Sequence, residues 1–214
     1  MKLIICLSML FALLWFNGTS QSSVRFYGGF NVSSAKYYYT DLTTQTDSTY
    51  NHTPYLFPTL GMQYNIEISD KFDLATGLGI SYVGARNYIT NVPAEFNLDN
   101  DLKLGYLQLP LGCRYKINRS LFLLPQYILN YNFRKNQSFY TEGPSPWSSI
   151  ELYNYFYHEA GLTLFFSSNR LDVGLQYAFG LAPIWDTKDL NPLYSARLTM
   201  SRIHLSIGYS IFDE

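Results

Sequence analysis

Apolar and polar side chains alternate along most of the chain from Val24 onward, a pattern typical of strands with two contrasting faces. In residues 72–82, one face carries Phe, Leu, Thr, Leu, Ile and Tyr, and the other carries only Asp, Ala, Gly and Ser. The segments 107–117, 171–181 and 203–211 repeat this contrast. Weaker alternation predicts further strands at about 23–33, 55–68, 121–134 and 153–166. The pattern therefore predicts an all-β fold with eight strands.

The connections between these strands alternate in length. Short polar turns are expected at 69–70, 118–120 and 167–169, where Asn, Asp and Ser favour tight hairpins. Long polar stretches lie at 34–53, 89–102, 135–151 and 182–199. This layout indicates an eight-stranded antiparallel up-and-down transmembrane β-barrel, with short turns in the periplasm and long loops outside the cell. An even number of strands leaves both termini on the periplasmic side.

The character of the two faces indicates which of them points outward. The apolar face is broad and aromatic, whereas the other face is mostly Gly, Ala, Ser and Gln with a few charges. A soluble barrel keeps its apolar face inside, but the lumen of an eight-stranded barrel is narrow and suits small side chains. We therefore expect the apolar face to contact lipid. A soluble sandwich with one aromatic core face is the alternative, and it accounts less well for the loop alternation.

The composition agrees with a membrane barrel. Aromatic residues make up 18% of the 214 residues and charged residues only 14%, against roughly 25% charged in soluble domains. The formal net charge is −1. No cluster of Lys and Arg suggests nucleic-acid binding.

Residues 1–20 are expected to be a cleaved signal peptide, which leaves residues 21–214 as the outer-membrane barrel domain. Lys2 precedes an apolar run from Leu3 to Phe16, and small residues follow it at 18–20. An uncleaved anchor is the alternative, although the run is short for a spanning helix. Cys6 lacks the small residues that precede a lipoprotein site. Cleavage would leave Cys113 as the sole cysteine, which excludes an internal disulfide and a cysteine-based metal site.

One strand carries a family resemblance. The stretch Tyr106-Leu-Gln-Leu-Pro-Leu-Gly-Cys-Arg-Tyr-Lys116 resembles a strand of the Bacteroidota outer-membrane β-barrel family, which includes PorT-like proteins. Residues 77–82 and 205–212 resemble neighbouring and closing strands of that family. The resemblance implies a small eight-stranded barrel of the OmpA and OmpX type in the bacterial outer membrane. Asp213 and Glu214 depart from the usual aromatic C-terminus.

Polar residues on the inward face are expected to form a hydrogen-bonded and ionic network in the lumen. Glu159 and Asp172 should pair with Arg114, Lys116 or His204, because charges away from water persist only when paired. The network could serve as a proton or ion path, but a structural filling of a closed lumen is the preferred interpretation. Its expected members are Asp73, Gln108, Arg114, Lys116, Gln126, Glu159, Asp172, Gln176 and His204.

No catalytic residue, cofactor or metal site is expected. The only conceivable catalytic group is His52, which lies near Asp47, Ser48 and Thr53 in the first long loop. Loops rich in Ser, Thr and Asp are common, so this grouping does not predict an enzyme. No two histidines have the spacing of metal ligands.

The long loops are the expected working surface, because a rigid scaffold commonly carries function on its connections. Aromatic anchors there could bind a surface protein or a glycan, or could instead pack on the barrel mouth among lipopolysaccharide headgroups. The candidates are Tyr38, Tyr39, Tyr140, Trp147, Trp185 and Tyr194. We therefore expect a monomeric structural or surface-interaction barrel in contact with outer-membrane lipid. A PorT-like accessory of protein secretion and a lipid-modifying enzyme are the alternatives.

Overall fold

The computed structural model describes residues 22–51, 53–86, 101–137, 155–186 and 194–212. The described residues form ten strands in one antiparallel sheet and include no helix long and apolar enough to cross a membrane. The strands are β1 (Ser22–Asp41), β2 (Thr46–Asn51), β3 (Thr53–Ser69), β4 (Phe72–Arg86), β5 (Asp101–Lys116), β6 (Leu121–Gln137), β7 (Phe156–Ser168), β8 (Leu171–Gly180), β9 (Trp185–Asp186) and β10 (Tyr194–Phe212).

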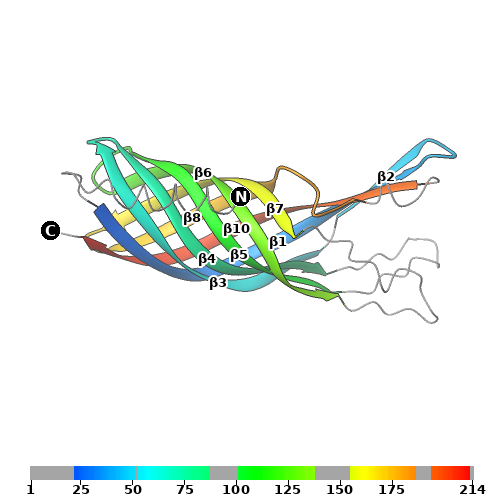
Figure 1. The fold of residues 1–214 in the computed structure, drawn as a ribbon, viewed down its shortest axis with the longest axis horizontal. Helices are drawn as coiled ribbons and strands as arrows, with labels where there is room; N and C mark the ends of the chain where they lie inside the picture. The colour runs from blue at the N-terminus through cyan, green and yellow to red at the C-terminus, as the bar shows by residue number, and fades with distance from the viewer. Residues whose placement is uncertain (1–21, 52, 87–100, 138–154, 187–193, 213–214) are drawn as a thin grey trace, which may run out of the picture.

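Eight of these strands close into a barrel. The order is β1-β3-β4-β5-β6-β7-β8-β10, and β10 pairs with β1 from Ser23↔Phe212 to Asp41↔Tyr194. Figure 1 shows the tilted barrel with its long axis horizontal. The predicted fold class is confirmed, and all eight predicted strands lie within observed barrel strands to within about three residues at their ends.

The three predicted short turns lie at one end of the barrel. They connect β3 to β4, β5 to β6 and β7 to β8, and Asn169 adopts a φ of 54° in the last of them. Asn tolerates this left-handed conformation better than most residues. The first residues of β1 lie at this end too, because Ser22 pairs with Ile66 close to the β3–β4 turn, and the last residue of β10, Phe212, pairs with Ser23.

At the opposite end, the strands run well beyond the predicted boundaries. β1 continues to Asp41 and forms a hairpin with β2, and β10 begins at Tyr194 rather than near 203. The range 34–53 is therefore largely strand, as is part of 182–199, and the expectation of loops there was wrong. In Figure 1 this sheet extension projects past the rest of the barrel, with β2 labelled at its edge.

The inward and outward faces of the barrel strands are those that the sequence predicts. Large apolar side chains cover the outer wall, and many are about half exposed to the surroundings; Leu60 reaches 67% and Ile207 63%. A continuous apolar wall of this kind is far larger than the patches that soluble monomers expose. Polar and small side chains point inward, so the barrel is built to have lipid outside and side chains inside.

Aromatic pairs lie on this outer wall near both ends. Phe72 and Tyr115 lie with ring centroids 5.1 Å apart beside the short turns. Tyr131 and Phe156 pair at 5.4 Å towards the other end. Each pair contains a tyrosine, whose hydroxyl suits the depth of lipid headgroups, and the two pairs lie towards opposite ends of the outer wall.

Candidate functional site: the filled lumen

The lumen holds three groups of charged side chains. The first two groups join strands that are not neighbours in the barrel, whereas the third joins the adjacent strands β3, β4 and β5.

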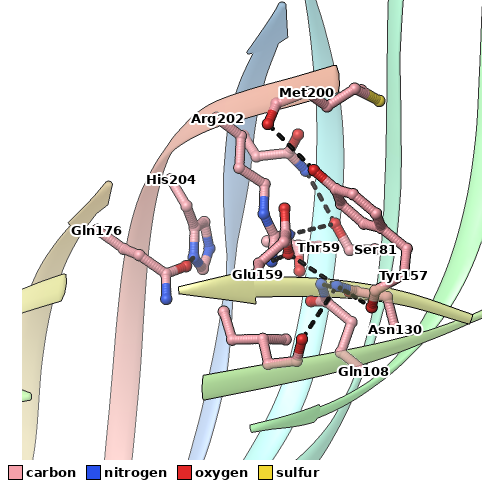
Figure 2. Close-up of polar contacts among 12 residues, drawn as sticks. Thr59, Ser81, Gln108, Asn130, Tyr157, Glu159, Gln176, Met200, Arg202 and His204 are labelled. Atoms are coloured by element: carbon pink, nitrogen blue, oxygen red, sulfur yellow. Dashed lines mark hydrogen bonds and ion pairs between the residues drawn. The ribbon is translucent and has the colours of Figure 1, made fainter. Parts of the chain in front are cut away.

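The first group is built around an ion pair between Glu159 of β7 and Arg202 of β10. Arg202 Nη2 lies 2.7 Å from Glu159 Oε2, and both side chains are 4% exposed. Arg202 Nη1 donates to Ser81 at 3.3 Å, and Asn130 Nδ2 donates to Glu159 at 2.8 Å. Gln108 in turn donates to Asn130 Oδ1 at 2.7 Å. Figure 2 shows this chain of contacts crossing the lumen.

The second group joins β1 to β8. Arg25 Nη2 lies 2.5 Å from Asp172 Oδ1, and Arg25 Nε donates to the same oxygen at 2.7 Å. Arg25 also donates to Ser206 at 3.3 Å. Its guanidinium lies 4.6 Å from the ring centroid of Phe165 and 5.0 Å from that of Tyr27. Hydrogen bonds and aromatic rings together replace the water that the cation loses.

The third group lies next to the short turns. Arg114 Nη2 is 2.5 Å from Asp73 Oδ2, and Lys116 Nζ is 3.2 Å from Asp73 Oδ1 and 3.6 Å from Glu67. The Arg114 guanidinium lies 4.8 Å from the ring centroid of Phe122. Lys116 and Glu67 are about a quarter exposed, so this group meets solvent at the mouth of the barrel.

The long-loop end of the lumen is apolar instead. Eight buried side chains form one cluster there, and Ile184, from the connection after β8, is among them. The Ile184 N–H donates to Leu198 O at 2.8 Å, which fixes the connection across the barrel mouth. Tyr157 donates its hydroxyl to Met200 O at 3.1 Å from inside this cluster. The cluster, called the apolar plug below, comprises Ala35, Val83, Leu104, Tyr106, Tyr157, Ile184, Leu198 and Met200.

Glycines make room for the largest interior side chains. A Cβ at Gly180 would lie 1.8 Å from the Tyr157 hydroxyl, and one at Gly208 would lie 2.5 Å from Arg25 Nε. A side chain at either of these inward positions would therefore require Tyr157 or Arg25 to shift. The lumen is thus packed so closely that some inward positions are occupied by glycine.

This lumen can hold the barrel rigid, but its charges are compensated in pairs. A buried ion pair gives little net stability, whereas loss of one partner is strongly destabilising. Among the residues that the structure describes, no group of three His, Cys, Asp or Glu side chains could hold a metal ion. The arrangement is therefore that of a packed interior with local charge balance.

The structure places all nine predicted lumen residues in the interior. Gln108, Gln126, Gln176 and His204 line one small cavity, and Glu159 lies just beyond it. Asp73, Arg114 and Lys116 contact one another near the short turns. Asp172 does not join them.

The predicted partners of Glu159 and Asp172 were wrong. Glu159 pairs with Arg202 and Asp172 with Arg25, instead of with Arg114, Lys116 or His204. The sequence did contain a signal, because Arg25 and Arg202 occupy inward positions in the alternation, as His204 does. The pairing itself depends on strand stagger, which the alternation leaves undetermined.

The predicted loop candidates are only partly described. Tyr38 lies in the extended part of β1, where the Arg197 guanidinium is 4.8 Å from its ring centroid. Tyr39, Trp185 and Tyr194 belong to β1, β9 and β10 by their backbones. Tyr140 and Trp147 lie outside the described residues, as does His52.

Comparison with known proteins adds a family to this geometry. The family model described as outer membrane protein beta-barrel domain matches residues 17–186. The chain belongs to this family. Membership places the barrel in the bacterial outer membrane, in agreement with its apolar outer wall. No curated protein sequence matches the chain.

Several solved structures are similar to this barrel at low sequence identity. OprG from Pseudomonas aeruginosa is 13% identical, with 91% of this chain and 98% of that chain covered and a TM-score of 0.46. Ail from Yersinia pestis, in complex with the heparin analogue sucrose octasulfate, is 10% identical, with 87% and 99% covered and a TM-score of 0.40. Neisserial surface protein A is also 10% identical, with 86% and 96% covered and a TM-score of 0.40.

Proposed function

We propose that this small outer-membrane barrel is a surface-interaction protein that acts through the sheet extension at its long-loop end. The observation that carries the proposal is a contrast between the two parts of the molecule. The lumen is packed with ion pairs and an apolar plug, whereas β1, β2 and β10 continue past the barrel as a paired sheet.

The packed lumen argues against transport as the main activity. An eight-stranded barrel is just wide enough for its own side chains, and the apolar plug lies across the end where a solute would enter from outside. Opening a path would require the Glu159–Arg202 pair or the plug to move. A rigid, closed scaffold is what an exposed binding element needs.

The sheet extension has the chemistry of a contact surface. Residues 36–41 and 46–51 are rich in Tyr, Thr, Ser and Asp, which combine aromatic contact area with hydrogen-bonding groups. Thr40 donates to Asp47 at 2.8 Å, and Arg197 stacks on Tyr38. These contacts and the strand pairing order the extension in the structure, and preorganisation of this kind lowers the entropic cost of binding.

The partner we expect is a glycan or a protein at the cell surface. A PorT-like role as an accessory of protein secretion is an alternative that rests only on the resemblance of residues 106–116. Lipid modification remains the other alternative. Mass spectrometry of lipid A from a deletion strain tests it: we expect an unchanged acyl pattern, and the loss of one modification would favour an enzyme.

A trimmed variant tests the proposal directly. Tyr37 pairs with Tyr50 in the hairpin register, so residues 38–49 can be replaced by Asn-Gly, which closes a two-residue hairpin. Cells displaying the full-length protein should bind immobilised surface glycans or surface proteins of the same organism, and cells displaying the trimmed protein should not.

The matched control for trimming is Gln126→Leu, which alters the lumen and leaves the sheet extension intact. Both variants should show the heat-modifiable gel migration of a folded barrel. Full binding by the trimmed variant, or loss of binding only in Gln126→Leu, would contradict the proposal.

A further inference from the structure

The middle of the lumen contains a small cavity between the first and second charged groups. Its volume is about 30 Å³, and its lining is mostly polar. It is lined by Arg25, Tyr27, Gln63, Gln108, Pro110, Gln126, Ile128, Thr163, Phe165, Gln176, Arg202, His204 and Ser206. We call it the central chamber.

One polar atom at the central chamber is left without a partner. His204 is 93% buried, and its Nε2 has no hydrogen-bond partner among the described residues. Its other ring nitrogen, Nδ1, lies 3.4 Å from Gln176 Oε1. Figure 2 shows His204 and Gln176 facing each other beside the Arg202–Glu159 pair. A buried polar atom left unsatisfied costs about 1–3 kcal/mol in a protein, so such an atom indicates an occupant.

We propose that the central chamber is a binding site for ordered water, with room for about two molecules, one of which donates to His204 Nε2. A water molecule needs roughly 10–15 Å³ of such space and two to four polar partners. The chamber offers about 30 Å³ and carboxamides from four strands, at Gln63, Gln108, Gln126 and Gln176.

The direction of the hydrogen bonds favours water over an ion. Gln176 Oε1 can only accept, so the facing His204 Nδ1 carries the proton in the neutral ring and Nε2 becomes an acceptor. An acceptor needs a donor, which water supplies and a small anion does not.

The charge balance of the chamber supports the same choice. Arg25 and Arg202 are the only side chains with a permanent charge in the lining, and each is already neutralised by Asp172 or Glu159. An additional anion would be a net charge among mostly buried side chains, which is costly. Water adds hydrogen bonds without adding charge.

Water in the central chamber would connect the Arg25–Asp172 pair to the Glu159–Arg202 pair across the space between them. Bridging water would connect His204 to the surrounding carboxamides, so the polar network would run without a gap from Arg25–Asp172 to Glu159–Arg202. The apolar plug lies beyond this network and keeps it apart from the extracellular side. The lumen would then be hydrated in the middle and closed to solutes.

Nuclear magnetic resonance of the full-length protein refolded in lipid bilayers tests the proposal. Water-edited spectra should show rapid transfer from water to the side chains of His204 and Gln126, several-fold faster than to the plug residue Leu104. The ¹⁵N shifts of His204 should show a neutral ring with its proton on Nδ1. Absence of transfer, or a proton on Nε2, would overturn the proposal.

Two substitutions at Thr163 form a matched pair. Thr163 lines the chamber and accepts a hydrogen bond from Gln126 at 3.1 Å. Thr163→Val removes this bond at constant volume and should leave the water signal at His204. Thr163→Ile is one carbon larger than Thr163→Val and should displace water, so that transfer to His204 falls towards the level of Leu104. An unchanged signal in folded Thr163→Ile would place the water elsewhere and contradict the proposal.

Exchanging the salt distinguishes bound water from a bound anion in the central chamber without any substitution. If the chamber holds water, replacing chloride by bromide or gluconate at constant ionic strength should leave the His204 shifts unchanged. Shifts that follow the identity of the anion would show a halide site and overturn the proposal. Because this measurement uses the natural chain, it decides the matter even if Thr163→Ile does not fold.

Discussion

Glu159 shows how the interior tolerates charge at the level of single residues. Its carboxylate is buried and receives hydrogen bonds from Arg202 and Asn130 at 2.7 and 2.8 Å. Arg202 supplies the opposite charge and Asn130 a second donor, and without Arg202 the carboxylate would be uncompensated in a medium of low dielectric constant. Loss of either Arg202 or Glu159 should therefore leave the other charge buried and unpaired.

Arg202→Met should accordingly lower the free energy of unfolding by about 3–5 kcal/mol, because it leaves Glu159 buried and unpaired. The double variant Arg202→Met/Glu159→Leu should recover most of this loss. Urea unfolding in lipid vesicles measures both. Lys116→Met is the control, since Lys116 and Glu67 are partly exposed, and it should cost about 1 kcal/mol or less. Equal losses in the two single variants would contradict this account.

Gly180 tests how closely the lumen is packed. A Cβ at this position would overlap the Tyr157 hydroxyl, so Gly180→Ala should destabilise the barrel by about 1–3 kcal/mol. Gly28→Ala is the matched control, because its Cβ would meet only the flexible end of Leu60 at 3.0 Å. The same unfolding experiment compares them. A cost as small for Gly180→Ala as for Gly28→Ala would show that Tyr157 moves freely.

The sequence predicts which residues point inward but not which of them meet. Alternation alone assigns Glu159, Asp172 and His204 to the lumen, because the contrast between faces is a local property. The partners of the two acids lie 43 and 147 residues away along the chain. Their meeting depends on the stagger between strands and on the closure of β1 against β10, for which a single sequence carries no local signal.

At the level of elements, the ends of the strands were harder to predict than their middles. Within the membrane, lipid and lumen impose opposite preferences on successive residues, as in residues 72–82. Beyond the apolar band both faces meet water, so residues 36–51 show no alternation although their backbones pair in regular register. The pattern therefore underestimates β1 and β10 at the long-loop end.

The tip of the hairpin between β1 and β2 contains a turn that is sensitive to pH. Asp41 Oδ1 accepts the N–H of Thr43 at 2.8 Å and that of Thr44 at 3.2 Å. These hydrogen bonds lower the pKa of the Asp41 carboxyl below its ordinary value of 3.8.

A lowered pKa means that the contribution of Asp41 to the turn is present above the ordinary value and is lost as pH falls through the lowered one. A carboxyl ¹³C titration of Asp41 should give a midpoint below 3.8, and the Thr43 and Thr44 amide shifts should change at the same pH. Asp47, which accepts from the Thr40 hydroxyl, provides a carboxyl on the same hairpin for comparison. A midpoint at or above 3.8 for Asp41 would contradict the hydrogen bonds described.

At the scale of the whole molecule, the barrel has an outer wall suited to lipid and an interior filled by its own side chains. The apolar outer wall and the aromatic pairs fit it to the outer membrane, and family membership agrees with this location. Ion pairs, carboxamides and the apolar plug fill the interior. The sequence predicted the apolar outer wall and the polar interior, because both follow from composition and alternation. It does not predict the binding partner, which depends on the chemistry of the exposed surface.

The most direct test of this account is the efflux of small solutes from proteoliposomes that contain the purified protein. A filled and plugged lumen predicts efflux of chloride and of a monosaccharide no faster than from protein-free vesicles, while protein recovered from the same vesicles shows the heat-modifiable migration of a folded barrel. Steady efflux that rises with the amount of folded protein would contradict the closed lumen.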